Sequence, residues 1–90
     1  MIKLLTDIQV KILRLLLRHI TMSRYELVKE SKIPRTTLYD NLEILLNMNY
    51  INRMKVKRKG VGRPRILWFI ERNMLSVIKE KGFFDNKYIN

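Results

Sequence analysis

Basic side chains without an acidic neighbour fill the stretch from Arg53 to Arg65. The seven cations are Arg53, Lys55, Lys57, Arg58, Lys59, Arg63 and Arg65. Like charges that face each other across strands repel, so an exposed segment without a binding role usually contains both acidic and basic residues. A run of one sign fits the phosphate backbone of a nucleic acid. We expect Lys57, Arg58, Lys59, Arg63 and Arg65 to contact DNA, with Arg63 reaching the minor groove. The alternative is an edge strand that its cations protect from aggregation.

A second group of polar side chains begins directly after Pro34. Its members are Arg35, Thr36, Thr37, Tyr39, Asp40 and Asn41. Arginine binds guanine edges or phosphate, hydroxyls bind phosphate or bases, and a carboxylate accepts from the cytosine amino group. These residue types on one helix predict readout of base edges in the major groove. The alternative is an ordinary solvated helix face.

The whole chain is small and strongly basic, which limits the classes of function. Its 90 residues carry a formal net charge of +11 and include no cysteine and one histidine, His19. The absence of cysteine favours a cytoplasmic protein and excludes thiolate chemistry, and a lone histidine predicts no metal site. No nucleophile–histidine pair, carboxylate cluster or phosphate-binding loop indicates an enzyme. We expect no cofactor and no small-molecule effector. We also expect no membrane contact, because the cations are concentrated in the segment from Arg53 to Arg65 and not on the polar face of an amphipathic helix.

The helices that would position these residues can be located from their caps. Thr6 and Gln9 form a capping-box pattern before a helix over residues 7–18, and Ser23 and Glu26 form another before a helix over 24–31. After a short turn, Pro34 suits the first position of a third helix that runs to about residue 48. A left-handed conformation is expected at Asn49, which follows the third helix.

The period of the apolar residues then changes from helical to two, as in strands. Met54 and Val56 alternate with cations, and Ile66 to Ile70 is apolar and aromatic. The two segments predict a β-hairpin in which Met54 and Trp68 belong to the core. A last helix follows, from about residue 72 to Lys81.

This order of elements resembles the winged helix-turn-helix of MarR-like and PadR-like transcriptional regulators. The residues that carry the resemblance are ELVKESKIPRTTLYDNLEILLNMNYI, from Glu26 to Ile51, and GRPRILWFI, from Gly62 to Ile70. The resemblance implies a mainly α fold with a small β-hairpin, the wing. One domain then spans 1–90, with the helix-turn-helix at about 23–48, the wing at about 51–70 and a C-terminal helix and tail at about 72–90. It also implies sequence-specific binding of double-stranded DNA and regulation of transcription. The alternative is a winged-helix module that binds protein or RNA.

A homodimer is the last expectation. The first helix has apolar residues around more of its circumference than one small core can cover, and the tail is rich in aromatic residues. The predicted interface residues are Leu13, Leu17, Leu75, Phe83, Phe84 and Tyr88. The alternative is a monomer whose tail folds over its own core.

Overall fold

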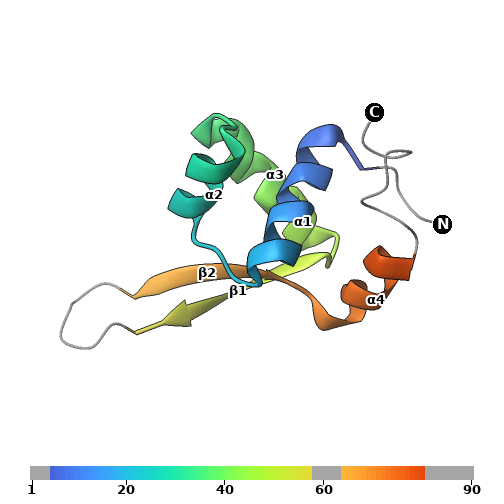
Figure 1. The fold of residues 1–90 in the computed structure, drawn as a ribbon. Coiled ribbons are helices and arrows are strands. Elements are labelled where there is room, and N and C mark those ends of the chain that lie inside the picture. The colour runs from blue at the N-terminus through green and yellow to red at the C-terminus, as the bar shows by residue number, and fades with distance from the viewer. Residues whose placement is uncertain (1–4, 58–63, 81–90) are drawn as a thin grey trace.

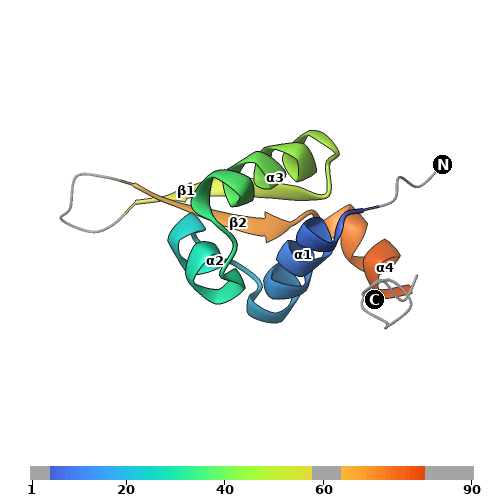
Figure 2. The ribbon, with the colours of Figure 1, turned by 90° about the horizontal axis from the view of Figure 1, so that it is seen from above.

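A computed structural model describes residues 5–57 and 64–80 of the chain. Along these residues the elements are α1 (Asp7–His19), α2 (Arg24–Ser31), α3 (Arg35–Asn47), β1 (Ile51–Val56), β2 (Arg65–Ile70) and α4 (Arg72–Glu80). The first three helices lie over one face of the antiparallel β1–β2 hairpin (Figure 1). The hairpin extends beyond the helices at one end, and α4 lies at the other end (Figure 2). The predicted winged helix-turn-helix is confirmed.

Both predicted capping boxes are present. The Thr6 hydroxyl accepts from the Gln9 amide at 3.2 Å, and the Gln9 side chain accepts from the Thr6 amide at 3.1 Å. Ser23 and Glu26 make the same two bonds, at 3.2 and 2.9 Å. Pro34 differs from the prediction, because it is the N-cap of α3 with φ −54° and ψ 142° and lies outside the helix. Without a side-chain hydroxyl it leaves this helix uncapped, unlike α1 and α2.

Two left-handed residues set the angles at which α2 and α3 end. Lys32 has φ 61°. The hydroxyl of the buried Ser31 before it accepts a hydrogen bond from the Ile33 amide at 3.1 Å. Asn49 has φ 63°, and the Tyr50 amide donates back to the Leu45 carbonyl at 3.0 Å. That bond closes a helix in the way a glycine-terminated helix usually ends, with asparagine in the strained position. The predicted left-handed conformation of Asn49 is confirmed.

The core of a single chain takes up more of α1 than its sequence pattern suggested. Val10 and Leu13 lie off the main apolar stripe, yet they are 4% and 0% exposed. Leu13 therefore has no surface left for a partner, and its assignment to a dimer interface is wrong. The reason is that α1 packs against α2, α3 and β2 together, so its buried arc is wide. Leu17 is only half-buried.

The register of the hairpin turns Met54 away from the core. Trp68 is buried and lies opposite Arg53, whereas Met54 lies opposite Leu67. Because side chains alternate between the two faces of a hairpin, Arg53 shares the face of Trp68 and Met54 shares the other. Met54 is 42% exposed and Val56 39% exposed. The predicted alternation is present, but the core role of Met54 is wrong.

Trp68 lies where the strands and helices meet. It is 2% exposed, as predicted for a core residue. Its backbone amide and carbonyl bond to those of Met22, at 2.8 and 3.0 Å, along the edge of β2 that β1 leaves open. The segment between α1 and α2 is thus fixed to the hairpin, and with it the orientation of the helices relative to the wing.

Candidate nucleic-acid interface

The outer face of α3 presents most of the polar residues predicted to read bases. Arg35, Thr36 and Asp40 are exposed, while Thr37 and Tyr39 are half-buried. The first amides of a helix have no acceptor within the helix, and no side chain caps those of α3. This turn therefore offers backbone donors together with a guanidinium and hydroxyls, which is a combination that binds phosphates and base edges.

Tyr39 is held in place by a residue that the sequence analysis missed. The Arg24 guanidinium lies 4.4 Å from the centre of the Tyr39 ring, within the range of a cation–π contact. Arg24 is exposed at the start of α2, so the stack adds a cation beside the face of α3. Its place one residue after the predicted cap of α2 was the available signal.

Asn41 does not belong to the outer face of α3. Its side-chain oxygen accepts from the Gln9 amide group at 3.1 Å, and its own amide group donates to the Thr37 carbonyl at 2.8 Å. Gln9 is buried in α1, so this bridge joins α1 to the inner side of α3. The DNA contact of Asn41 stays a prediction, and its geometry gives it little support because its amide is bonded on the side facing α1.

The described part of the hairpin carries basic but no acidic residues, as predicted, and one of its cations forms an ion pair with α3. Lys55 and Lys57 are exposed on and after β1, and Arg58, Lys59 and Arg63 lie outside the described residues. Arg53 reaches α3, where its guanidinium lies 3.3 Å from the Glu43 carboxylate and 5.5 Å from the centre of the Trp68 ring. This pair offsets an acidic charge that would otherwise repel phosphate beside α3.

Arg65 is paired within the protein. Its guanidinium lies 3.4 Å from the Glu26 carboxylate, which also caps α2. The pKa of Glu26 is lowered, first by the hydrogen bond from the Ser23 amide, then by the Ser23 hydroxyl, and by the charges of Arg65 and His19, against an opposing effect of burial. The carboxylate thus stays charged at neutral pH and holds Arg65, a predicted DNA contact, against α2.

The described residues contain neither a metal centre nor a membrane span. Within residues 5–57 and 64–80, nowhere do three or more histidine, cysteine, aspartate or glutamate side chains gather as metal ligands would. In the same part of the chain every helix is too short or too polar to cross a bilayer.

Comparison with known proteins shows the family to which the chain belongs. The model of the sugar-specific transcriptional regulator TrmB matches residues 5–70, which include α1 to β2. The chain belongs to the TrmB family and is a transcriptional regulator of the winged helix-turn-helix type, which implies DNA binding. This is a family of regulators and not of enzymes. None of the curated proteins matches the chain significantly.

Two solved structures share the fold. One is the circadian clock associated protein Pex from Anabaena, with a TM-score of 0.64 and 20% identity, covering 92% of this chain and 78% of that one. The other is Pex from Synechococcus sp. (strain PCC 7942), with a TM-score of 0.63 and 23% identity, covering 96% of this chain and 84% of that one. At these identities the likeness establishes the three helices, hairpin and final helix as a shared architecture.

The Glu26–Arg65 pair leads to a testable prediction. Glu26→Gln keeps an oxygen that accepts from the Ser23 amide, so the cap of α2 persists, but it removes the charge that holds Arg65. The exposed pair contributes at most about 1 kcal/mol to stability. We expect the fold to persist and duplex DNA to bind several-fold more tightly, with a salt dependence steeper by about one unit per chain, because Arg65 becomes free for phosphate.

The control is Glu30→Gln, which makes the same change of charge on an exposed residue of α2. It should tighten binding less than Glu26→Gln in the same fluorescence-anisotropy titration. Weaker DNA binding by Glu26→Gln would instead mean that the pair orients the wing. The pH dependence has a definite sign: since the Glu26 pKa is lowered on folding, its contribution is present above the unfolded pKa and is lost as pH falls through the folded pKa. That part of the acid dependence of stability should be missing in Glu26→Gln.

Proposed function

We propose that this regulator binds double-stranded DNA sequence-specifically as a homodimer. In this proposal α3 is the recognition helix and enters the major groove, while the hairpin lies along the backbone or in the minor groove. One observation supports it most. The first turn of α3 is exposed and uncapped, and the described strands of the hairpin bear cations and no acidic residue. Docking of this kind is how helix-turn-helix proteins read DNA.

The chemistry of α3 suits base readout as well as phosphate binding. Arg35 has the reach for a guanine edge or a phosphate, and Thr36 has both a hydroxyl and a methyl group for a thymine. Asp40 accepts hydrogen bonds and so favours a cytosine amino group, while it disfavours phosphate. A face with an acceptor among donors is better suited to discriminating sequences than to binding any duplex.

A role in binding RNA has less support. Sequence-specific RNA binding depends on aromatic side chains exposed for stacking on unpaired bases. Of the aromatic residues that the structure describes, Tyr25 is exposed, whereas Trp68 and Tyr50 are buried, at 2% and 7% exposed, and the Arg24 guanidinium lies over the Tyr39 ring. Duplex DNA, which is bound through its backbone and groove edges, fits these surfaces better.

The proposed dimer would place two recognition helices about one turn of DNA apart, roughly 34 Å, on a near-palindromic site. Leu17 and Leu75 are half-buried and remain candidates for its interface. The other candidates, Phe83, Phe84 and Tyr88, lie outside the described residues. This function would place the protein in the cytoplasm, bound to the chromosome.

The first prediction from this function concerns salt. If the dimer neutralises about six to ten phosphates, the logarithm of the binding constant should fall with the logarithm of salt concentration with a slope of about −5 to −9. Titrations of a fluorescent duplex at several potassium chloride concentrations measure this slope. A flat response would contradict binding dominated by phosphates.

The second prediction separates positioning from readout. Lys57→Ala should weaken binding to all duplexes by a similar factor and reduce the salt slope, because phosphate contacts carry little sequence information. Thr36→Ala should instead change the preferred sequence. Selection from random duplexes with each variant measures both effects, and Ser76→Ala on the exposed side of α4 serves as the control. An unchanged preference in Thr36→Ala and in a further Asp40→Ala variant would overturn the assignment of α3 as the reading helix.

A further inference from the structure

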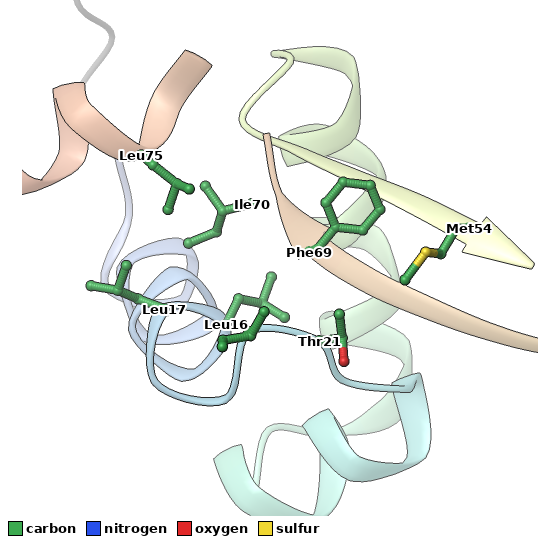
Figure 3. A pocket seen from close by; sticks show the side chains of 8 residues that line it. Leu16, Leu17, Thr21, Met54, Phe69, Ile70 and Leu75 are labelled. Carbon is green, nitrogen blue, oxygen red and sulfur yellow. The ribbon is translucent and has the colours of Figure 1, made fainter. Parts of the chain in front are cut away.

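An apolar groove lies on the side of the hairpin that faces away from α2 and α3. It encloses about 530 Å³ between the end of α1, the strands and α4. The lining residues are Leu16, Leu17, Ile20, Thr21, Met54, Phe69, Ile70 and Leu75. Figure 3 shows side chains from α1, β1, β2 and α4 around the groove. The lining includes no charged side chain, in a protein whose net charge is +11.

Ile20 stands in this groove in a conformation that is costly for its type. It has φ 72° and ψ −58°, and the Thr21 amide donates to the His19 carbonyl at 2.8 Å across it. These values define the rare and strained form of the γ-turn, and a positive φ is particularly unfavourable for a β-branched residue. The side chain is nevertheless 73% exposed, so burial within its own chain does little to offset the strain. Strain of this kind is found most often where a residue contacts a ligand or partner.

The charges on α1 indicate which side of this helix a second copy can approach. Lys11, Arg14 and Arg18 are all exposed and recur at helical spacing along one stripe. Two such stripes brought together would repel each other. The groove begins beside this stripe, at Leu17 of α1, and continues to Ile20 just after the helix with no charged lining residue.

The sequence provides a segment with four large apolar or aromatic residues after one wall of the groove. Leu75 of α4 contributes to that wall, and α4 ends at Glu80. The ten residues that follow, 81–90, include Phe83, Phe84, Tyr88 and Ile89 and reach up to about 33 Å when extended. Aromatic and branched side chains of this kind fill a groove of this size, and a small core leaves little room for them elsewhere.

We propose that the groove binds residues 81–90 of a second copy of the chain, and that Ile20 is a docking residue for them. The inference rests on the homodimer of the proposed function and adds the surface that forms it. Exchange of the two tails would cover both grooves and leave the basic stripes of α1 apart. A tail docked on its own chain would cover the groove too. A second copy could then approach α1 only on its basic stripe, where the two copies would repel each other.

A pair of matched variants tests the role of Ile20. Tyr25 is 74% exposed, almost as much as Ile20, but it lies on α2 outside the groove. Ile20→Asp should weaken dimerisation at least tenfold in analytical ultracentrifugation, and at micromolar protein the mass should fall to that of one chain, 10.9 kDa. Its thermal stability under monomeric conditions should not fall, because aspartate tolerates a positive φ better than isoleucine does. Tyr25→Asp should dimerise like the natural chain. Equal dimerisation by the two variants, or a monomeric natural chain, would overturn the proposal.

Cross-linking identifies the chain that provides the tail, since the natural sequence has no cysteine to interfere. Chains with Ile20→Cys and chains with Phe84→Cys are mixed and treated with a short bismaleimide. Linked dimers of the two different chains support docking of a second copy. A chain that carries both changes is treated in parallel. Linkage within that chain but not between the mixed chains, or no linkage in either sample, would overturn the proposal. Neither measurement includes DNA, so loss of DNA binding by the natural chain would refute the proposed function and leave the outcome of the cross-linking unaffected.

Discussion

The position of Trp68 in the middle of β2 constrains most of this structure. The strand bonds to β1 along one edge and to Met22 along the other, so one buried residue links the hairpin to the segment between α1 and α2. Burial of a tryptophan side chain gives one of the largest apolar contributions available to a domain of this size. Its indole N–H has no hydrogen-bond partner among the described residues, a deficit that costs about 1–3 kcal/mol. Packing at this point evidently outweighs the unpaired donor.

Two surfaces of opposite character follow from that register. With Trp68 facing the helices, Arg53 must lie on the same side, where it pairs with Glu43 and stacks on the indole. Met54 and Phe69 must then face the other way, where they join Leu17, Ile20 and Leu75 around the apolar groove. Arg53 and Lys55 thereby share the face of the hairpin that carries Trp68, while Met54 and Phe69 share the opposite face. A slip by one residue would exchange the two faces.

Features determined by neighbouring residues could be predicted from the sequence, and those determined by the register of distant segments could not. The caps at Thr6 and Ser23, and the left-handed Asn49, depend on residues within a few positions of each other. Met54 was expected in the core because alternation alone does not say which face is buried. Leu13, Asn41 and Arg65 were misassigned or incompletely described for a related reason, since their partners lie on other elements. The strained Ile20 had no signal in the sequence, because an isoleucine there does not favour a γ-turn.

The central claim is that DNA is bound by α3 and the hairpin, and not by the other basic surface, the exposed stripe on α1. Amide chemical-shift mapping with a duplex selected from random sequences tests it most directly, because both surfaces are observed in one titration. We expect shifts at Arg35, Thr36 and Lys57 that grow with added DNA, while the amides of Lys11, Arg14 and Arg18 remain unchanged. Shifts concentrated on α1, with the first turn of α3 unaffected, would contradict it.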